Sequence, residues 1–267
     1  VIMEELRTRD GANLRAQNDM FRNLFKGTIY EHRNLIGYLD GLKSFDHTAL
    51  EGFYKKWYRP EYQAIVIVGD IDVDQVEAKL KALMADIPAS PADAAQKEVV
   101  YVPATEEPII SVFADRELTQ SSVMMFARRE ALPKQFNNTQ VGYAYNIVYN
   151  LATMMMNNRF EEITQKADAP FLGGGMSEGS IGVCPTMDAT SFSVVAHEGR
   201  IIDGFRAMYT EMERMRRHGF TVGEFERAKQ ELLMYAERQY TNRNDVRNDD
   251  YAQRYRSEEH TSELQSP

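Results

Sequence analysis

The pattern of apolar and polar positions predicts alternating helices and one strand in the first part of the chain. Residues 1–26 are polar with scattered large apolar side chains, which predicts one or two surface helices. Asp46 precedes apolar residues at helical spacing, and the run stops at Arg59-Pro60, so we expect a helix with Asp46 as its N-cap. Residues 64–68 contain only Ala, Ile and Val, which is typical of a strand buried on both faces.

A second helix and then a linker are expected next. Asp72 stands at an N-cap position, with Gln75 three residues later, and apolar residues follow at helical spacing. The segment after this helix is rich in small residues and carries two prolines, Pro88 and Pro91. We therefore interpret residues 89–104 as a linker between two cores.

The residues after the linker predict one sheet with paired helices. Four segments have the composition of strands: 109–114, 121–127, 171–183 and 189–197. Three segments place apolar residues on one helical face: from about 137 to 163, 200–218, and from 221 onward. Gly219 is expected to end the second helix, and Thr221 with Glu224 forms a capping box for the third. This order of elements indicates a two-layer α+β domain.

Composition narrows the class of protein. The chain has 267 residues, with 31 Lys and Arg against 40 Asp and Glu, a net charge of −9. An acidic balance argues against a nucleic-acid partner and against binding to an anionic membrane surface. The longest apolar run, residues 64–68, is too short for a transmembrane segment. A single cysteine, Cys184, excludes an internal disulfide framework.

Most common chemical motifs are absent from the sequence. Gly173-Gly174-Gly175 lacks the Lys-Ser/Thr ending of a phosphate loop, and we interpret it as a turn or the start of a strand. Cys184 has no histidine nearby in sequence, which favours a buried structural thiol. No histidine is followed by another one helical turn later, so the sequence contains no helical zinc pair.

Both ends of the sequence are unusual. The chain begins at Val1 inside a predicted helix, without an initiator Met or a signal segment, so we expect the true N-terminus to be missing. Residues 256–267 resemble the in-frame translation of a short-read sequencing adapter, with a polar C-terminal tail as the alternative. The fold prediction therefore stops at residue 255.

The run FYKKWYRPEYQAIVIVGDID, from Phe53 to Asp72, closely resembles a segment of the pitrilysin/insulinase family of zinc metallopeptidases. In that family a helix ends in a Tyr-x-Pro step, leads into a central strand and turns at Gly-Asp into the next helix. Residues 27–37 and 158–173 agree with the family in position, and the resemblance covers nearly all of residues 1–255. It implies two two-layer domains, each a sheet with helices on one face, of which the first is only a C-terminal half.

The resemblance also implies a zinc site. The family is similar to other inverted zinc peptidases in its H-x-x-E-H motif, and a glutamate on a later helix is the third ligand. Zinc held in this way lowers the pKa of its bound water, and the glutamate of the motif takes the proton. The opening VIMEE is similar to the end of the third-ligand helix, which assigns Glu5 as the zinc ligand. If the match is shifted by one residue, Glu4 is the ligand instead. The structural alternative is that both glutamates simply form a solvent-facing acidic helix end.

The motif H-x-x-E-H itself is absent from the sequence. The resemblance places it upstream of Val1, so we expect no catalytic residue in this chain and no activity from the chain alone. It implies that residues 1–88 are the second half of the catalytic domain, 89–104 the linker, and 105–255 a non-catalytic domain of the same fold.

The resemblance predicts that the parent protein is a zinc metalloendopeptidase. It would act on peptides or unfolded protein segments, bound by strand addition at a sheet edge, together with the other domains of the parent chain. The alternative is a catalytically dead family member that acts as a structural or peptide-binding subunit. Export to the envelope or periplasm of a Gram-negative cell is implied by resemblance alone.

Overall fold

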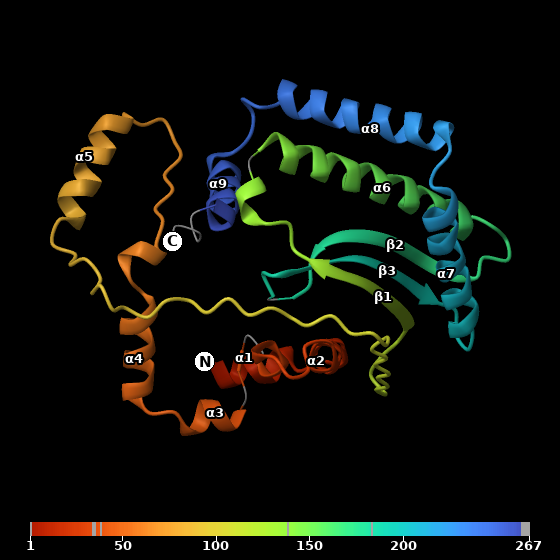
Figure 1. The fold of residues 1–267 in the computed structure, drawn as a ribbon, viewed down its shortest axis with the longest axis horizontal. Coiled ribbons are helices and arrows are strands. Elements are labelled where there is room, and N and C mark those ends of the chain that lie inside the picture. The colour runs from red at the N-terminus through yellow and green to blue at the C-terminus, as the bar shows by residue number, and fades with distance from the viewer. Residues whose placement is uncertain (1, 34–35, 38, 138, 183, 263–267) are drawn as a thin grey trace. The chain divides into compact units, whose positions relative to one another are not determined.

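The computed structural model describes residues 2–33, 36–37, 39–137, 139–182 and 184–262 (Figure 1). The chain divides into two compact units. Unit 1 comprises Val1–Leu42, Val99–Leu132 and Tyr143–Tyr235, and unit 2 comprises Lys43–Glu98, Pro133–Gly142 and Ala236–Pro267. The sheet lies in unit 1.

Unit 1 is built on a three-stranded antiparallel sheet in the order β1-β3-β2. Its strands are β1 (Ser121–Glu130), β2 (Phe171–Ser180) and β3 (Met187–Ala196). Its helices are α1 (Ile2–Arg9), α2 (Ala12–Leu24), the 3-10 turn η1 (Ile29–His32), most of α6 (Gln140–Thr164), α7 (Ile201–His218) and most of α8 (Val222–Thr241). The expected strands at 121–127, 171–183 and 189–197 are confirmed, except that position 183 lies outside the described residues.

The regular secondary structure of unit 2, over its described residues, is entirely helical. It holds α4 (His47–Trp57), the 3-10 turns η2 (Pro60–Tyr62) and η3 (Lys134–Phe136), α5 (Val73–Met84) and α9 (Asn248–Ser262), while α3 (Leu39–Ser44) spans the boundary. Residues 256–262 continue α9, and 263–267 lie outside the described residues, so the resemblance to an adapter stays a prediction.

One face of the sheet is covered by α6 and α7. Along β3, Phe192 and Val194 point to this side, where they pack against Met156 and Phe160 of α6 and Met208 of α7. Each of these five side chains is at most 2% exposed. The period-two alternation of β3 therefore supplies the predicted two-layer core.

The other face of the sheet packs against the N-terminal helices. Phe25 and Tyr30 meet Cys184, Met187 and other residues of this second apolar cluster, which draws on distant parts of the chain. Cys184 is 1% exposed, in agreement with a structural thiol. Residues from the start of the chain are thus part of the core of the sheet domain.

The predicted helix ends agree with the observed caps. Asp46 accepts a hydrogen bond from the Ala49 amide at 2.7 Å, and Asp72 accepts one from the Gln75 amide at 3.0 Å. Gly219 follows α7 with φ +65°, a left-handed conformation that favours glycine. These caps form because each depends on residues within one helical turn.

Two predicted strands are wrong. Residues 64–68 and 109–114 are not in regular structure, and Ile65 and Ile67 are 56% and 46% exposed rather than buried on both faces. A strand needs a neighbour for its backbone hydrogen bonds, and no described segment of the chain pairs with either of these two in the structure. The high β propensity of these two segments is therefore not sufficient to make them strands.

One glycine of β2, Gly174, is explained by the close approach of neighbouring atoms. The interpretation of Gly173-Gly174-Gly175 as part of a strand rather than a phosphate loop is confirmed. A Cβ on Gly174 would lie 2.8 Å from Val194 Cγ1 and 3.0 Å from the Ser193 carbonyl oxygen, whereas a Cβ on Gly173 would meet nothing within 4 Å.

Gly174→Ala is therefore expected to destabilise unit 1 by about 1–3 kcal/mol, because the added methyl group forces a shift of the β3 backbone. Gly173→Ala in the same strand is the matched control and should change stability by less than about 1 kcal/mol. Thermal unfolding followed by circular dichroism compares the two. Equal losses in both variants would show that the contact with β3 is not the cause.

Candidate functional site

The predicted zinc ligand Glu5 lies on the exposed helix α1. Its carboxylate pairs with Arg9 at 2.7 Å, and its side chain is 45% exposed. Glu4 is also exposed and pairs with Arg7 on the same helix. Both carboxylates face solvent-accessible space, and each forms an ion pair with an arginine one turn away on α1, so the structure does not separate the two registers.

The described residues do not form a metal centre by themselves. No group of three or more His, Cys, Asp or Glu side chains lies close enough to hold a metal ion in the described part of the chain. Of the histidines, His197 contacts the Ala169 carbonyl oxygen at 3.0 Å and His32 lies 3.5 Å from Glu31. Zinc needs several ligands in one place, so Glu5 can be at most one contribution to a site.

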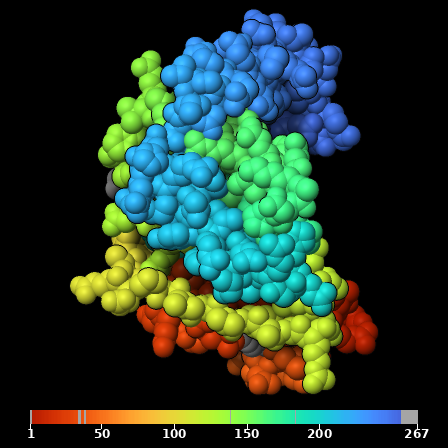
Figure 2. Space-filling model, turned by 90° about the vertical axis from the view of Figure 1, so that its right-hand side faces the viewer, coloured from red at the N-terminus to blue at the C-terminus, as the bar shows by residue number. Residues whose placement is uncertain are grey.

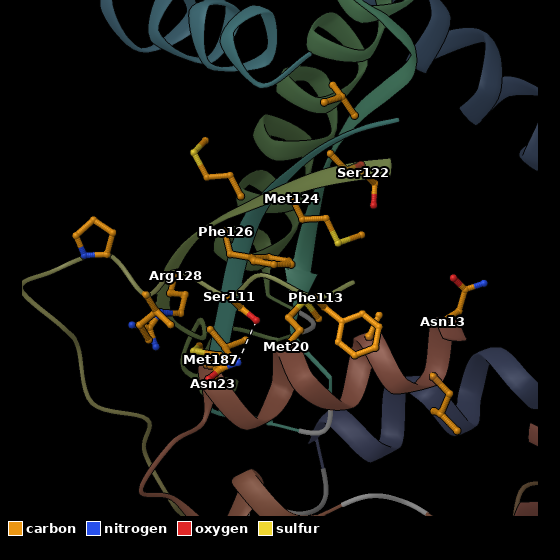
Figure 3. A pocket seen from close by; sticks show the side chains of 18 of the residues that line it. Asn13, Met20, Asn23, Ser111, Phe113, Ser122, Met124, Phe126, Arg128 and Met187 are labelled. Carbon is orange, nitrogen blue, oxygen red and sulfur yellow. Dashed lines mark hydrogen bonds between the residues drawn. The ribbon is translucent and has the colours of Figure 1, made fainter. Parts of the chain in front are cut away.

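A cavity of about 1540 Å³ opens within unit 1, on the face of the sheet away from α6 and α7 (Figure 3). Its floor is the outer side of β1, where Met124, Phe126 and Arg128 point into the cavity. Met20 and Asn23 of α2 form the facing wall. Sequence reasoning did not find this cavity, although the alternation of Met124, Phe126 and Arg128 along β1 was present as a signal.

The third wall of the cavity is residues 109–117, which we call the strap. Figure 3 shows Ser111 and Phe113 lying between α2 and the side chains of β1. The Ser111 hydroxyl donates to Asp19 at 2.9 Å and accepts from the Asn23 amide at 3.0 Å. The strap is therefore attached to α2, and the yellow segment of Figure 2 lies along the red N-terminal helices.

Arg15 of α2 makes a second contact with the strap, through ion pairs. Its guanidinium donates from Nε to Asp115 at 2.9 Å and from Nη2 to Glu117 at 2.6 Å. The hydrogen bond from Arg15 holds the pKa of the Asp115 carboxyl below its ordinary value. The ion pairs are only partly shielded from water, so they fix position more than they add stability.

A second polar contact joins α6 to α8 in the helix layer. Arg159, inside the sequence motif at 158–162, donates two hydrogen bonds to the Glu224 carboxylate and one to the Gly219 carbonyl oxygen at 3.0 Å. Glu224 also accepts from the Thr221 amide at 2.6 Å, which is the predicted capping box. The hydrogen bond from Arg159 lowers the pKa of Glu224 from 4.5 to about 2.

Glu224→Gln is expected to cost about 2 kcal/mol at neutral pH, because the Arg159 guanidinium then loses its charged acceptor. The folded-state pKa of Glu224 is depressed, so its contribution is complete above about pH 5 and is lost as the pH falls toward 2. Urea unfolding at pH 7 and pH 3 should therefore show a smaller difference between wild type and variant at pH 3.

Glu226→Gln is the control for this experiment. The Glu226 side chain is 50% exposed and lies 3.5 Å from Lys229, so its loss should cost less than about 0.5 kcal/mol at either pH. A Glu224→Gln penalty that does not shrink at pH 3 would contradict the assigned role of the carboxylate charge.

Comparison with known proteins gives the class of this chain. The family described as "Peptidase M16 inactive domain" matches residues 44–232, more than two thirds of the sequence. The chain belongs to this family, and the resemblance to the pitrilysin/insulinase zinc metallopeptidases is confirmed. The mixed α and β fold agrees with it.

Curated relatives carry names that refer to zinc proteases. The chain is 25% identical over 235 residues to "Probable zinc protease PqqL" of Escherichia coli. The matched region covers 88% of this chain and 25% of that protein. It is 29% identical over 171 residues to "Zinc protease PQQL-like" of Arabidopsis thaliana, covering 64% of this chain and 18% of that one. The chain thus spans about a quarter of the length of the E. coli relative.

Solved structures show the same fold. The crystal structure of the periplasmic protease PqqL from E. coli matches 97% of this chain and 28% of that one, with a TM-score of 0.83 at 21% identity. The crystal structure of the first half of that protease matches 100% of this chain and 56% of that one, also with a TM-score of 0.83.

The helices of the described residues do not meet the requirements of a membrane span. None of them combines the length and the apolar composition that a transmembrane helix needs.

Proposed function

We propose that this chain is part of a zinc metalloendopeptidase that hydrolyses peptides or unfolded protein segments with zinc-activated water. The observation that carries the proposal is the match across 88% of the chain to a protein named as a probable zinc protease. The chain itself is proposed to be inactive, because its described residues supply at most one zinc ligand.

Glu5 is the proposed third zinc ligand, with Glu4 as the alternative. The support is that α1 presents both carboxylates at an exposed surface, each paired with an arginine of its own helix. Such pairs are weak and can be exchanged for a metal ion. The two histidines and the general-base glutamate of H-x-x-E-H belong to a part of the parent chain that the sequence does not contain.

The proposed domain division keeps residues 1–88 as the second half of the catalytic domain, 89–104 as a linker and 105–255 as a non-catalytic domain. The packing of residues 1–42 within unit 1 departs from this division, and two other observations support it. Residues 88–120 contain no helix or strand, and all three strands of the sheet follow residue 105. The crystal structure of the first half of a periplasmic protease covers the whole chain, as expected for two adjoining domains.

The proposed partners are polypeptide substrates and the remaining domains of the parent chain. One structural relative was solved as a ferredoxin protease in complex with Arabidopsis ferredoxin, with a TM-score of 0.65. Another relative is described as periplasmic, which supports the same compartment for the parent of this chain.

A catalytically dead parent is the second candidate, favoured by the description of the matched family as an inactive domain. Recovery of the full reading frame by long-read sequencing, followed by expression of the full-length protein, separates the two. The peptidase proposal expects an intact H-x-x-E-H, about one zinc per chain and peptide hydrolysis that stops with a chelator. A frame that lacks a histidine or the glutamate of the motif would overturn it.

A further inference from the structure

Strand β1 has one open edge. The strand order β1-β3-β2 gives β1 a single neighbour, and no backbone hydrogen bond joins its outer side to another described segment. The strand is 10 residues long, and Met124 on it is 57% exposed. A long edge with unpaired amides and carbonyls is a template for any extended chain that reaches it.

The strap carries the pattern of a missing strand next to this edge. Residues 118–120 alone separate it from β1 in sequence, and a turn at its end is already formed, because the Leu118 amide donates to the Asp115 carbonyl oxygen at 3.2 Å. Ile110 and Val112 are 82% and 87% exposed, although β-branched residues at alternate positions favour a half-buried strand. Ser111 and Phe113, which alternate with them, line the cavity.

The turn sets the register of a hairpin. If Asp115 and Leu118 are its last pair, Ile110 lies opposite Val123 and Ser111 lies opposite Ser122. Val123 packs against the core between the sheet and the helices. Ile110 would then add to the helix-covered face, and Ser111 would stay on the cavity face, where it is now.

We propose that the strap is a movable fourth strand, which pairs with the open edge of β1 and is held away from that edge by its attachment to α2. In the attached arrangement, Arg15 bonds Asp115 and Glu117, and Asp19 and Asn23 bond Ser111. When these bonds release, the strap covers the edge and buries Ile110. The position of the strap therefore controls whether β1 can pair with another extended segment.

Disulfide trapping tests the proposal on the full chain. Ile110→Cys with Val123→Cys places two thiols at a pair without backbone hydrogen bonds, where Cα atoms approach within about 4.5 Å and a disulfide can close. Ile109→Cys with Val123→Cys is the matched control, because its side chains point to opposite faces. The native Cys184 is 1% exposed and does not compete.

The first pair is expected to cross-link at least about tenfold faster than the control under mild oxidation, and addition of Arg15→Gln should accelerate it further. Equal rates for the two pairs, or slower trapping with Arg15→Gln, would overturn the proposal. Amide exchange of the unmodified chain gives an independent readout. The amides of Ser111 and Phe113 should exchange more slowly than those of Ile110 and Val112, and uniform exchange along the strap would overturn the hairpin.

Discussion

Glu5→Gln in the full-length parent protein is expected to lower peptide hydrolysis by at least about 100-fold and to reduce the zinc content well below one per chain. An amide has no negative charge, so it is a much weaker zinc ligand than a carboxylate of the same shape. The helix itself should tolerate the change, because Glu5 is exposed and its ion pair is with Arg9 on the same helix.

Glu4→Gln is the matched control, one residue away on the same helix and also paired with an arginine. It should leave the activity and the zinc content within about twofold of wild type. Zinc is measured by elemental analysis of the purified proteins, and folding is checked by circular dichroism. The reverse result, with loss in Glu4→Gln alone, would move the ligand to Glu4, and full activity in both would remove α1 from the zinc site.

Phe160→Ala should destabilise unit 1 by about 4 kcal/mol, a larger loss than either Gly174→Ala or Glu224→Gln causes. Phe160 is 0% exposed, and its ring lies 5.8 Å from that of Phe171 in an edge-on arrangement. Truncation leaves a cavity between α6 and the sheet, which the surrounding side chains fill only in part. The loss is a large share of the stability of a typical domain.

The measurement for Phe160→Ala is urea unfolding of the chain, followed by far-ultraviolet circular dichroism. Phe225→Ala on α8 is the control, because that ring is 41% exposed and its removal should cost less than about 1 kcal/mol. A similar midpoint for the two variants would mean that the core around Phe160 is loosely packed.

Local features of the fold could be predicted from the sequence, whereas pairings between distant segments could not. The caps at Asp46, Asp72 and Thr221 were predictable because the bonding groups lie within three residues of each other. Residues 64–68 have the same β-branched character as a buried strand, yet whether a strand forms depends on a neighbour elsewhere in the chain.

The candidate site could also be predicted from the sequence only in part. Glu5 was identified only through resemblance, because two adjacent acids on a short polar helix are also the pattern of a solvated surface. The ion pair between Arg159 and Glu224 could not be predicted either, because the two residues are distant in sequence. The sequence identified Glu224 only as part of a capping box. The prediction of a strand at residues 109–114 is wrong because the contacts of the strap with Arg15 and Asn23 depend on the placement of α2, which the local sequence does not contain.

The apolar cluster under the sheet also constrains the order in which the chain can fold. Phe25 and Tyr30 are synthesised before Cys184 and Met187, against which they pack and which follow more than half of this sequence later. A translating ribosome adds about 5–20 residues per second, so the early residues wait for several seconds with their aromatic rings uncovered. Nascent chains of this protein should therefore depend on chaperones until residue 196 and the whole of β3 have left the ribosome.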